Sequence, residues 1–380
     1  MNALSATGKP PSGERLARLA DSPRFNKGTF HNELKRRDGS YLKMTYDFVA
    51  GGSKHRMPTD ALPVQERSRA DYATPPDSGL RVTWLGHSTL LIEIDGVNVL
   101  VDPVWGERTS PFTWMGPKRF HAPPLPLSQL PRIDAVVISH DHYDHLDYPT
   151  ILALGDTIPQ YIVPLGVGSH LEQWGVSPER IVERDWWGEV QVGDVTLVAT
   201  PARHFSGRSI VMADQNRTLW SGWAMVGPEH RVYYSGDTAM FDGFTEIGER
   251  LGPFDLTLIE TGAYNAMWAD VHLGPEQALQ AHAMVRGKLF MPVHWGTFDL
   301  ALHAWTEPVE RALARAAQLG ENVVVPKPGE RFEPHAPPAV VRWWPEVPWE
   351  TAEQAPVVSS GLGKLALSAP ERTAEPALAE

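Results

Sequence analysis

The sequence predicts an α+β fold in which β-sheets are covered by helices. From residue 80 onward, short β-branched or apolar runs follow one another and are separated by turn residues. Asp95-Gly96 stands between two of these runs, and an Asp-Gly pair in that setting is a strong hairpin signal. Strands dominate this region, and four helical stretches lie among them. Such an order favours sheets with helices packed against them.

Each expected strand or helix is a run of residues that is bounded at both ends by residues of different character. The expected strands are residues 82–85, 90–94, 97–101, 135–139, 161–163, 195–199, 209–213, 219–226, 232–235 and 256–260. The expected helices are residues 166–174, 241–251, 275–286 and 307–318. Pro275-Glu276 gives the third helix a favourable first turn. Residues 103–131 carry seven prolines and little periodicity, which predicts a long ordered loop.

Composition divides the chain into three parts. Residues 1–78 are polar, with scattered proline, glycine and basic residues, and we expect them to form a loosely packed N-terminal arm. Residues 79–350 hold the predicted strands and helices and form the expected main domain. Residues 351–380 are rich in alanine, proline, glutamate and serine, which predicts a disordered tail.

Charge and residue usage exclude several classes of protein. The chain has 34 Lys and Arg against 46 Asp and Glu, so its net charge of −12 argues against nucleic acid as a partner. It has no cysteine, which excludes disulfides, iron–sulfur clusters, thiolate zinc sites and a cysteine nucleophile. No apolar run reaches 18 residues and the N-terminus has no apolar signal region, so we expect a cytoplasmic protein without a transmembrane helix.

The strongest functional signal is a histidine-rich loop directly after the buried strand at 135–139. It reads SHDHYDH and places four potential metal ligands within six positions: His140, His142, Asp144 and His145. A polar surface loop is the alternative, but this density of ligands behind a buried strand disfavours it. Neutral imidazole and carboxylate suit Zn²⁺, which we expect here, and also Mn²⁺ or Fe²⁺.

Three further polar residues follow apolar strands in the same way. They are His204, Asp237 and His294. Each alone would more often be structural, and an Asp after Ser-Gly is usually a turn residue. Together with the histidine-rich loop they supply seven ligands, more than one tetrahedral zinc can use. The sequence therefore predicts two divalent metal ions, with one carboxylate bridging them.

The order and strand-end placement of these residues resemble the metallo-β-lactamase superfamily. Loop motifs narrow the resemblance to the branch that contains N-acyl-phosphatidylethanolamine-hydrolysing phospholipase D. These motifs are GHST at 86–89, MGPKRF at 115–120, HYDHLDY at 142–148, DWW at 185–187, GPFDL at 252–256 and HWGTF at 294–298. The match covers roughly residues 80–310. It implies a four-layer αββα sandwich with an N-terminal extension and with the metals at one edge of the two sheets.

The resemblance also implies a role for each residue. One metal would take His140, His142 and His204. The other would take Asp144, His145 and His294, with Asp237 bridging the two. His272 matches a family histidine near the reacting phosphate, although its spacing alone would favour a polar residue at the entry of a helix. We therefore expect His272 and Asp144 to be catalytic.

The expected chemistry is attack of activated water on phosphorus, because two metal ions can acidify water and clamp a phosphoryl oxygen. An alkoxide leaving group needs a proton, and His272 is the candidate general acid. Asp147 has two interpretations of equal weight. It either supports a ligand histidine through a hydrogen bond or caps the N-terminus of a helix.

Aromatic and basic residues in the proline-rich loop suggest contact with a lipid interface. The aromatic and apolar members are Trp105, Phe112, Trp114, Met115 and Phe120, and the basic members are Lys118 and Arg119. Such a mixture suits peripheral contact with a membrane, whereas the alternative is that these aromatics form core beneath the loop. The net charge opposes anionic membranes, although a local basic patch would still act.

Three hypotheses for the function follow. The first is a phospholipase D-type phosphodiesterase acting on N-acyl phosphatidylethanolamine-like lipids or small phosphodiesters. The second is a lactonase or esterase of the same fold, because a fold does not fix a substrate. The third is a non-enzymatic metal-binding regulatory protein, which the bridging Asp237 disfavours.

Overall fold

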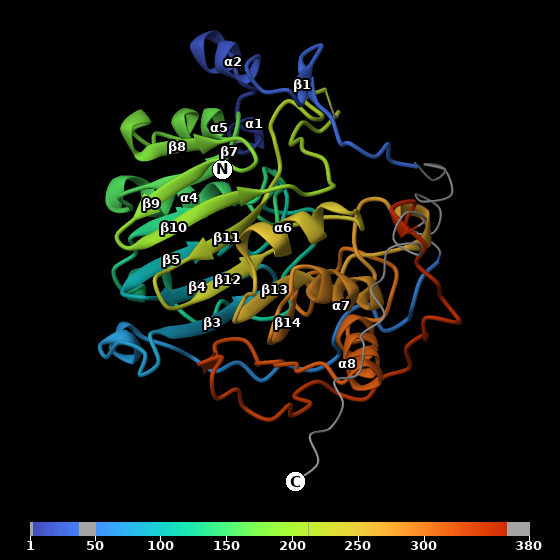
Figure 1. Ribbon diagram of the computed structural model, residues 1–380. Coiled ribbons are helices and arrows are strands. Elements are labelled where there is room, and N and C mark those ends of the chain that lie inside the picture. Colours follow the sequence, from blue (N-terminus) through green and yellow to red (C-terminus); the bar gives the residue numbers. More distant parts are fainter. Residues whose placement is uncertain (1–2, 38–50, 212, 363–380) are drawn as a thin grey trace.

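The computed structural model describes residues 3–37, 51–211 and 213–362. Two mixed β-sheets form its centre (Figure 1). The seven-stranded sheet has the order β15 (Arg331–Phe332), β3 (Leu80–Gly86), β4 (Thr89–Ile94), β5 (Val97–Val101), β6 (Ala135–Val137), β7 (Tyr161–Pro164) and β8 (Ile181–Arg184). The six-stranded sheet has the order β14 (Phe290–Val293), β13 (Leu256–Glu260), β12 (Arg231–Tyr234), β11 (Gly222–Val226), β10 (Val195–Thr200) and β9 (Glu189–Val192).

Each sheet combines an antiparallel part with a parallel part. In the seven-stranded sheet, β15, β3, β4 and β5 pair antiparallel, and β5 to β8 pair parallel. In the six-stranded sheet, β9 to β12 pair antiparallel, and β12, β13 and β14 pair parallel. The predicted hairpin joins β4 to β5. Asp95 and Gly96 at its tip both have positive φ, at 47° and 84°, as a type I′ turn requires.

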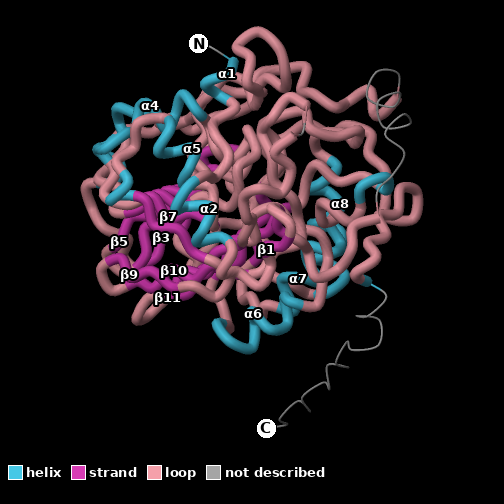
Figure 2. The backbone as a smooth tube through the Cα atoms, turned by 90° about the horizontal axis from the view of Figure 1, so that it is seen from above, coloured by secondary structure: helices cyan, strands magenta, loops and turns pink. Residues whose placement is uncertain are grey.

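Helices cover the outer face of each sheet. α4 (Tyr148–Leu154) and α5 (Gly168–Gln173) pack on the seven-stranded sheet, and α6 (Gly243–Leu251), α7 (Pro275–Met284) and α8 (Glu307–Leu319) pack on the six-stranded sheet. The expected four-layer αββα sandwich is therefore confirmed. Figure 2 shows that loop segments occupy much of the molecule around the strands.

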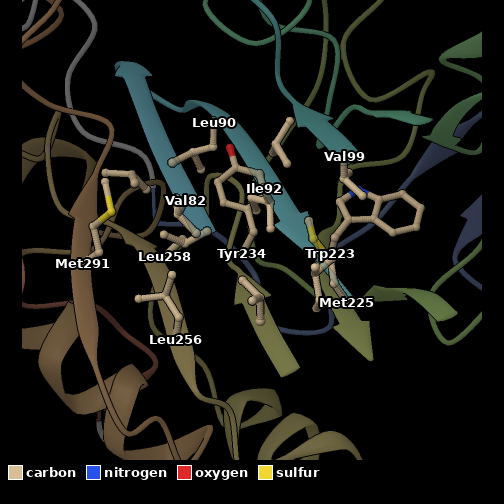
Figure 3. Packing of buried hydrophobic residues seen from close by; sticks show 14 of the residues in the cluster. Val82, Leu90, Ile92, Val99, Trp223, Met225, Tyr234, Leu256, Leu258 and Met291 are labelled. Atoms are coloured by element: carbon tan, nitrogen blue, oxygen red, sulfur yellow. The ribbon is translucent and has the colours of Figure 1, made fainter. Parts of the chain in front are cut away.

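Alternation along the strands explains why these layers form. In β4, Leu90 and Ile92 belong to the core between the sheets, whereas Leu91 belongs to the cluster beneath α4 and α5. Successive side chains on a strand point to opposite faces, so a strand buried on both sides reads as a continuous apolar run. Figure 3 shows the inner core, where Leu90 and Ile92 meet Tyr234 and Leu258 of the other sheet.

Several sequence predictions need correction. The strand expected at 209–213 does not form, because Asp214 accepts hydrogen bonds from the backbone N–H groups of Arg208 and Ser209 and holds the described part of the segment in turns. The strand expected from residue 219 begins only at Gly222. No helix was predicted at 148–154, where α4 forms, because seven residues are too few to establish a helical period.

The N-terminal and C-terminal segments are packed more closely than predicted. The N-terminal segment contains α1 (Ala3–Ala6), α2 (Gly13–Leu19), β1 (Phe25–Asn26) and β2 (Thr29–Phe30). Leu19 and Phe30 are fully buried in a cluster with Trp186 and Trp220, so a loose arm is wrong for this part. In the expected tail, Ser359 is buried and donates a hydrogen bond to Asp270, so disorder is wrong for residues 351–362.

The remainder of the predicted tail, residues 363–380, and residues 38–50 of the predicted arm lie outside the described residues. Among the residues that the structure does describe, no helix combines the length and the apolarity needed to cross a membrane.

Candidate metal centre

All seven predicted ligand residues meet at one edge of the sandwich. The edge is formed by loops that leave the carboxyl ends of four strands, which is where parallel strands of one sheet deliver their following residues. His140, His142, Asp144 and His145 follow β6, His204 follows β10, Asp237 follows β12, and His294 follows β14. Because β6 and β12 lie in different sheets, the centre forms only when the two sheets pack.

The first group of ligand atoms belongs to three histidines and Asp237. The His142 Nδ1 atom lies 2.8 Å from His140 Nε2 and 3.3 Å from His204 Nε2. Asp237 Oδ2 lies 3.7 Å from the Nε2 atoms of both His140 and His204. The four ligand atoms are all within 4.8 Å of one another, which is close enough to share one cation.

The second group centres on Asp144. Its Oδ2 atom lies 3.2 Å from His294 Nε2 and 3.4 Å from His145 Nε2. His87 joins this group, with its Nε2 atom 2.9 Å from the same oxygen. In the sequence, His87 stands out only as part of the GHST motif, and the tertiary structure places it beside Asp144.

Asp237 lies between the two groups. Its Oδ1 atom is 3.2 Å from His145 Nε2, and its Oδ2 atom is 3.1 Å from His294 Nε2. The same Oδ2 atom is the one that approaches His140 and His204. Asp237 is therefore the carboxylate that contacts ligand nitrogens of both groups, as a bridging ligand must.

A buried carboxylate behind the centre fixes one of its histidines. Asp102 Oδ2 accepts a hydrogen bond from His145 Nδ1 at 2.6 Å, which directs His145 Nε2 toward Asp237. Asp102 also accepts hydrogen bonds from the Ser139 N–H at 2.7 Å and from the Tyr234 hydroxyl at 2.6 Å. Such partners orient metal-binding histidines and select their tautomer.

Two further contacts hold the outer histidines. His204 Nδ1 donates a hydrogen bond to the carbonyl of Val271 at 2.9 Å, leaving Nε2 toward the centre. His294 has a positive φ of 65°, an uncommon conformation for a non-glycine residue. The backbone of Gly262 packs against its carbonyl so closely that a Cβ on Gly262 would collide with that oxygen.

His272 lies beside the two groups and has its own carboxylate partner. Its Nδ1 atom donates to Glu260 Oε2 at 2.6 Å and lies 3.9 Å from Asp237 Oδ2. Glu260 Oε1 in turn accepts the Thr238 N–H at 2.6 Å and the Leu273 N–H at 3.2 Å. Burial raises the pKa of Glu260, and the His272 imidazole opposes that rise.

Burial and nearby charges shift the pKa values of the histidines in different directions. Burial lowers the pKa of His140 and His204 well below the usual range, and lowers the pKa of His87 to about 3, so these rings are neutral at pH 7. Burial also acts to lower the pKa of His294, but Asp237 and Asp144 outweigh it and raise the pKa to about 10. A cation between these carboxylates would displace that proton, because metal ligands must be deprotonated.

The donor set fits divalent metal ions. His145 Nε2 and Asp237 Oδ1 are buried and, among the described residues, have no hydrogen-bond partner, although they lie 3.2 Å apart. Buried polar atoms are normally satisfied, and two such atoms facing each other are suited to share a cation. Imidazole and carboxylate are the ligand types that Zn²⁺, Mn²⁺ and Fe²⁺ accept.

The carboxylates that accept hydrogen bonds from the histidines of this site were not predicted from the sequence. Asp102 and Glu260 occupy the same kind of position as the predicted ligands, at or directly after the end of an apolar strand. Applying that criterion to every strand would have found both. Tyr234 offered no such signal, since its hydroxyl reaches Asp102 only because two sheets pack against each other.

Asp147 occupies the N-cap position of a helix, and its described hydrogen bonds do not reach a ligand histidine. It is the N-cap residue of α4, and its carboxylate accepts hydrogen bonds from the Thr150 hydroxyl and from the Gly106 N–H. Burial raises its pKa. The first interpretation of Asp147 is therefore replaced by the second, with the added role of anchoring the proline-rich loop at Gly106.

The basic residues of the proline-rich loop are engaged within the protein. Arg119 is partly buried, donates hydrogen bonds to the carbonyls of Val104 and His121, and lies over the ring of Phe298. Lys118 forms an exposed ion pair with Glu107 at 2.8 Å. The guanidinium of Arg119 is therefore engaged by groups of the protein itself, and contact of either basic residue with a lipid interface stays a prediction.

The aromatic residues of that loop divide into two sets. Trp105 and Phe120 pack against the hydrophobic cores, as the alternative interpretation proposed. Trp114 and Met115 are exposed, at 72% and 46% of their surface, and Phe112 contacts Trp114 with ring centroids 5.6 Å apart. The loop therefore presents an apolar tip to solvent.

Comparison with known proteins agrees with this architecture. A family model for the β-lactamase superfamily domain matches residues 97–295. An uncharacterised protein of Mycobacterium tuberculosis is 48% identical over 332 residues, which are 85% of this chain and 87% of that protein. N-acyl-phosphatidylethanolamine-hydrolyzing phospholipase D 1 of Caenorhabditis elegans is 39% identical over 266 residues, 65% of this chain and 74% of that protein.

A solved structure shares the fold. Isothiocyanate hydrolase from Delia radicum gut bacteria superposes with a TM-score of 0.54 and 21% identity, covering 67% of this chain and 98% of that one. The chain thus belongs to the β-lactamase superfamily, and it is a metal-dependent hydrolase of that class. Within the superfamily it belongs to the branch of the N-acyl-phosphatidylethanolamine-hydrolysing phospholipases D.

Proposed function

We propose that the protein is a phospholipase D-type phosphodiesterase that acts on N-acyl phosphatidylethanolamine-like lipids. The observation that carries this proposal is the position of Asp237, which lies within 4 Å of nitrogens from both ligand groups while His272 stands beside it. The 39% sequence identity with the phospholipase D of Caenorhabditis elegans supports the proposed substrate class.

The ligand assignment is part of this proposal. His140, His142 and His204 would hold one divalent cation, Asp144, His145 and His294 would hold a second, and Asp237 would be shared between them. A pair of divalent ions, for which zinc is our proposal, would supply polarisation of a phosphoryl oxygen and a lower pKa of water. His87 orients Asp144 through the 2.9 Å contact with its Oδ2 atom.

His272 supplies the proton that the leaving group needs. Glu260 accepts the Nδ1 proton of His272, so the opposite ring nitrogen, Nε2, is the atom that delivers a proton to substrate. Glu260 stabilises the imidazolium, in the way that a buried carboxylate supports the histidine of a catalytic triad. The side chain of His272 remains 13% exposed, whereas the Asp237 side chain is 2% exposed. The more accessible side chain suits proton transfer.

The overall reaction balances without a covalent intermediate. The oxygen of water attacks phosphorus, and the bond between phosphorus and the ethanolamine oxygen breaks. The departing oxygen takes a proton from His272, one proton of the attacking water stays on the product phosphate, and the other is released and restores the proton of His272. The products are an N-acylethanolamine and a phosphatidate. Serine and cysteine nucleophiles are not required.

Two loops beside the histidine-rich loop fit a lipid interface. The loop with Trp114 is anchored to the histidine-rich loop's end through Gly106 and Asp147. A second loop carries Ile210 and Val211, which are 58% and 80% exposed. Peripheral contact of both apolar tips with a lipid surface is part of the proposal.

A direct test measures the products of lipid hydrolysis. Purified full-length protein supplied with zinc is mixed with vesicles that contain N-palmitoyl phosphatidylethanolamine, and both products are quantified. A chromogenic ester and a lactone are assayed in parallel. Release of N-acylethanolamine and phosphatidate in equal amounts supports the proposal. Ester or lactone turnover without lipid turnover would assign the protein to the lactonase or esterase class instead.

A further inference from the structure

Two cavities meet at His303, beside the metal centre. A small cavity is lined by His303 together with His294, Ala263 and Phe298. A larger cavity of about 740 Å³ is lined by His303 together with Tyr264 and Trp349. His303 therefore stands at the junction between a cavity that touches a proposed metal ligand and a cavity large enough for part of a lipid.

The His303 ring presents an unused acceptor at this junction. Its Nδ1 atom lies 2.9 Å from the Ala304 carbonyl, so Nδ1 carries the proton and donates it to that oxygen. Burial lowers the pKa of His303 to about 4, so Nε2 is an unprotonated acceptor at neutral pH. Nε2 is buried and, among the residues described, has no hydrogen-bond partner.

The ring cannot easily turn away from the junction. It stacks on Tyr264 with ring centroids 4.4 Å apart and an interplanar angle of 22°. Tyr264 is itself fixed, because its hydroxyl donates to Glu307 Oε1 at 2.7 Å. A buried acceptor that is held rigidly and lacks a donor is costly, unless a ligand supplies the donor.

Chain segments outside the matched family domain form part of the wall of the larger cavity. Residues 52–55 form part of the wall and are fixed where the Ser53 N–H donates to the Leu302 carbonyl at 2.7 Å. Residues 348–357 form another part and are fixed where Arg311 donates to the Ala355 carbonyl at 3.1 Å. Trp349 and Val357 add apolar surface to the lining.

The order of these features matches the order of groups in the proposed substrate. An N-acyl phosphatidylethanolamine has a phosphate, a two-carbon link, an amide N–H and then an acyl chain. We infer that His303 Nε2 accepts the amide N–H of the substrate while the N-acyl chain enters the larger cavity. This inference rests on the proposed function, and it makes His303 the residue that recognises the amide.

The test compares an amide substrate with its ester counterpart. In the ester, oxygen replaces the amide N–H of N-palmitoyl phosphatidylethanolamine, so the donor is lost at nearly constant size. We expect the zinc-supplied protein to prefer the amide in kcat/KM by at least about 10-fold, because the ester leaves a buried acceptor unpaired. His303→Phe should reduce that ratio toward one, and His303→Gln, which keeps an acceptor, should retain part of it.

Controls separate recognition from folding and from the proposed function. Metal content and thermal unfolding report whether each variant is folded, and His335→Phe changes an exposed histidine that lines neither cavity. If the unaltered protein cleaves both lipids equally, or if His303→Phe keeps the amide preference, the inference is wrong and the proposed function stands. If the unaltered protein cleaves neither lipid but hydrolyses bis(p-nitrophenyl) phosphate, the proposed lipid substrate and this inference both fail.

Discussion

Tyr234 donates its hydroxyl to Asp102 at 2.6 Å across the interface between the two sheets. Tyr234 ends β12 of the six-stranded sheet, and Asp102 directly follows β5 of the seven-stranded sheet. Because the same Asp102 oxygen also receives the His145 Nδ1 proton, the packing of the sheets is connected to the orientation of a proposed metal ligand.

Replacing Asp102 should therefore weaken metal binding. Asp102→Asn keeps the size of the side chain but removes its charge. The new amide N–H₂ group would face partners that themselves donate hydrogen bonds to Asp102. We expect metal affinity to fall by about 10- to 100-fold, measured by competition with a chromogenic chelator.

Tyr234→Phe is the matched variant, because it removes one hydrogen bond to Asp102 and leaves the carboxylate. An unchanged affinity in Asp102→Asn would show that His145 is oriented by other contacts.

Asp237→Ala should abolish turnover while most of the fold remains. Without the shared carboxylate, nothing would offset the repulsion between two cations. We therefore expect activity to fall by more than about 100-fold, which exceeds the usual effect of changing a residue that only hydrogen-bonds to a metal ligand. Circular dichroism checks the fold and elemental analysis checks the metals. Near-normal activity with both metals retained would refute the bridging role.

Metal removal should be reversible and should reveal two ions per chain. Dialysis against a chelator is expected to abolish hydrolysis, and titration with zinc should restore it with a stoichiometry near two, because seven ligands exceed the needs of one tetrahedral ion. Elemental analysis of the reconstituted protein supplies the count. A consistent value of one in fully active protein would contradict the two-ion assignment.

His272→Ala should slow substrates with poor leaving groups most. General acid catalysis contributes about 10²- to 10⁴-fold, so we expect a loss of that size on a lipid phosphodiester. A nitrophenolate leaves without a proton, and hydrolysis of bis(p-nitrophenyl) phosphate should be largely spared.

Glu260→Gln provides a second check on the same proton, because it removes the charge that supports the His272 imidazolium. It should reproduce the leaving-group dependence of His272→Ala in a weaker form. Equal losses on both substrates would instead indicate that His272 positions the substrate. Loss of metal would make His272 part of the metal site.

Gly262→Ala should destabilise the centre through its backbone. The new Cβ would collide with the His294 carbonyl, and a backbone group cannot move aside as the end of a flexible side chain can. Overpacking of this kind costs about 1–3 kcal/mol, which a urea unfolding curve would detect. Gly96→Ala is a useful comparison, because no atom lies within 4 Å of a Cβ there, although its positive φ of 84° adds strain of its own. An unfolding curve for Gly262→Ala that matches the unaltered protein would contradict the tight packing.

The sequence by itself predicted most strands of the two sheets, the order of the ligands and their placement at strand ends. Continuous apolar runs such as that of β4 predict burial on both faces, and the spacing of His140, His142, Asp144 and His145 predicts a metal site whatever the rest of the chain does. These features depend on neighbouring residues, so they can be read locally. The turn at 209–211 was misread because Asp214 satisfies backbone N–H groups that a strand would have paired.

Only the tertiary structure decided which residues hydrogen-bond to the ligands and which residues line the cavities beside them. Tyr234 reaches Asp102 across 132 positions of sequence, and Glu260 reaches His272 across a loop. Arg119 is partly buried, and its guanidinium group donates to backbone carbonyls of its own loop. His303 lines two cavities whose walls come from residues 52–56, 263–266, 294–307 and 348–357. Such relationships depend on how distant segments pack, and no local pattern of residue types encodes that packing.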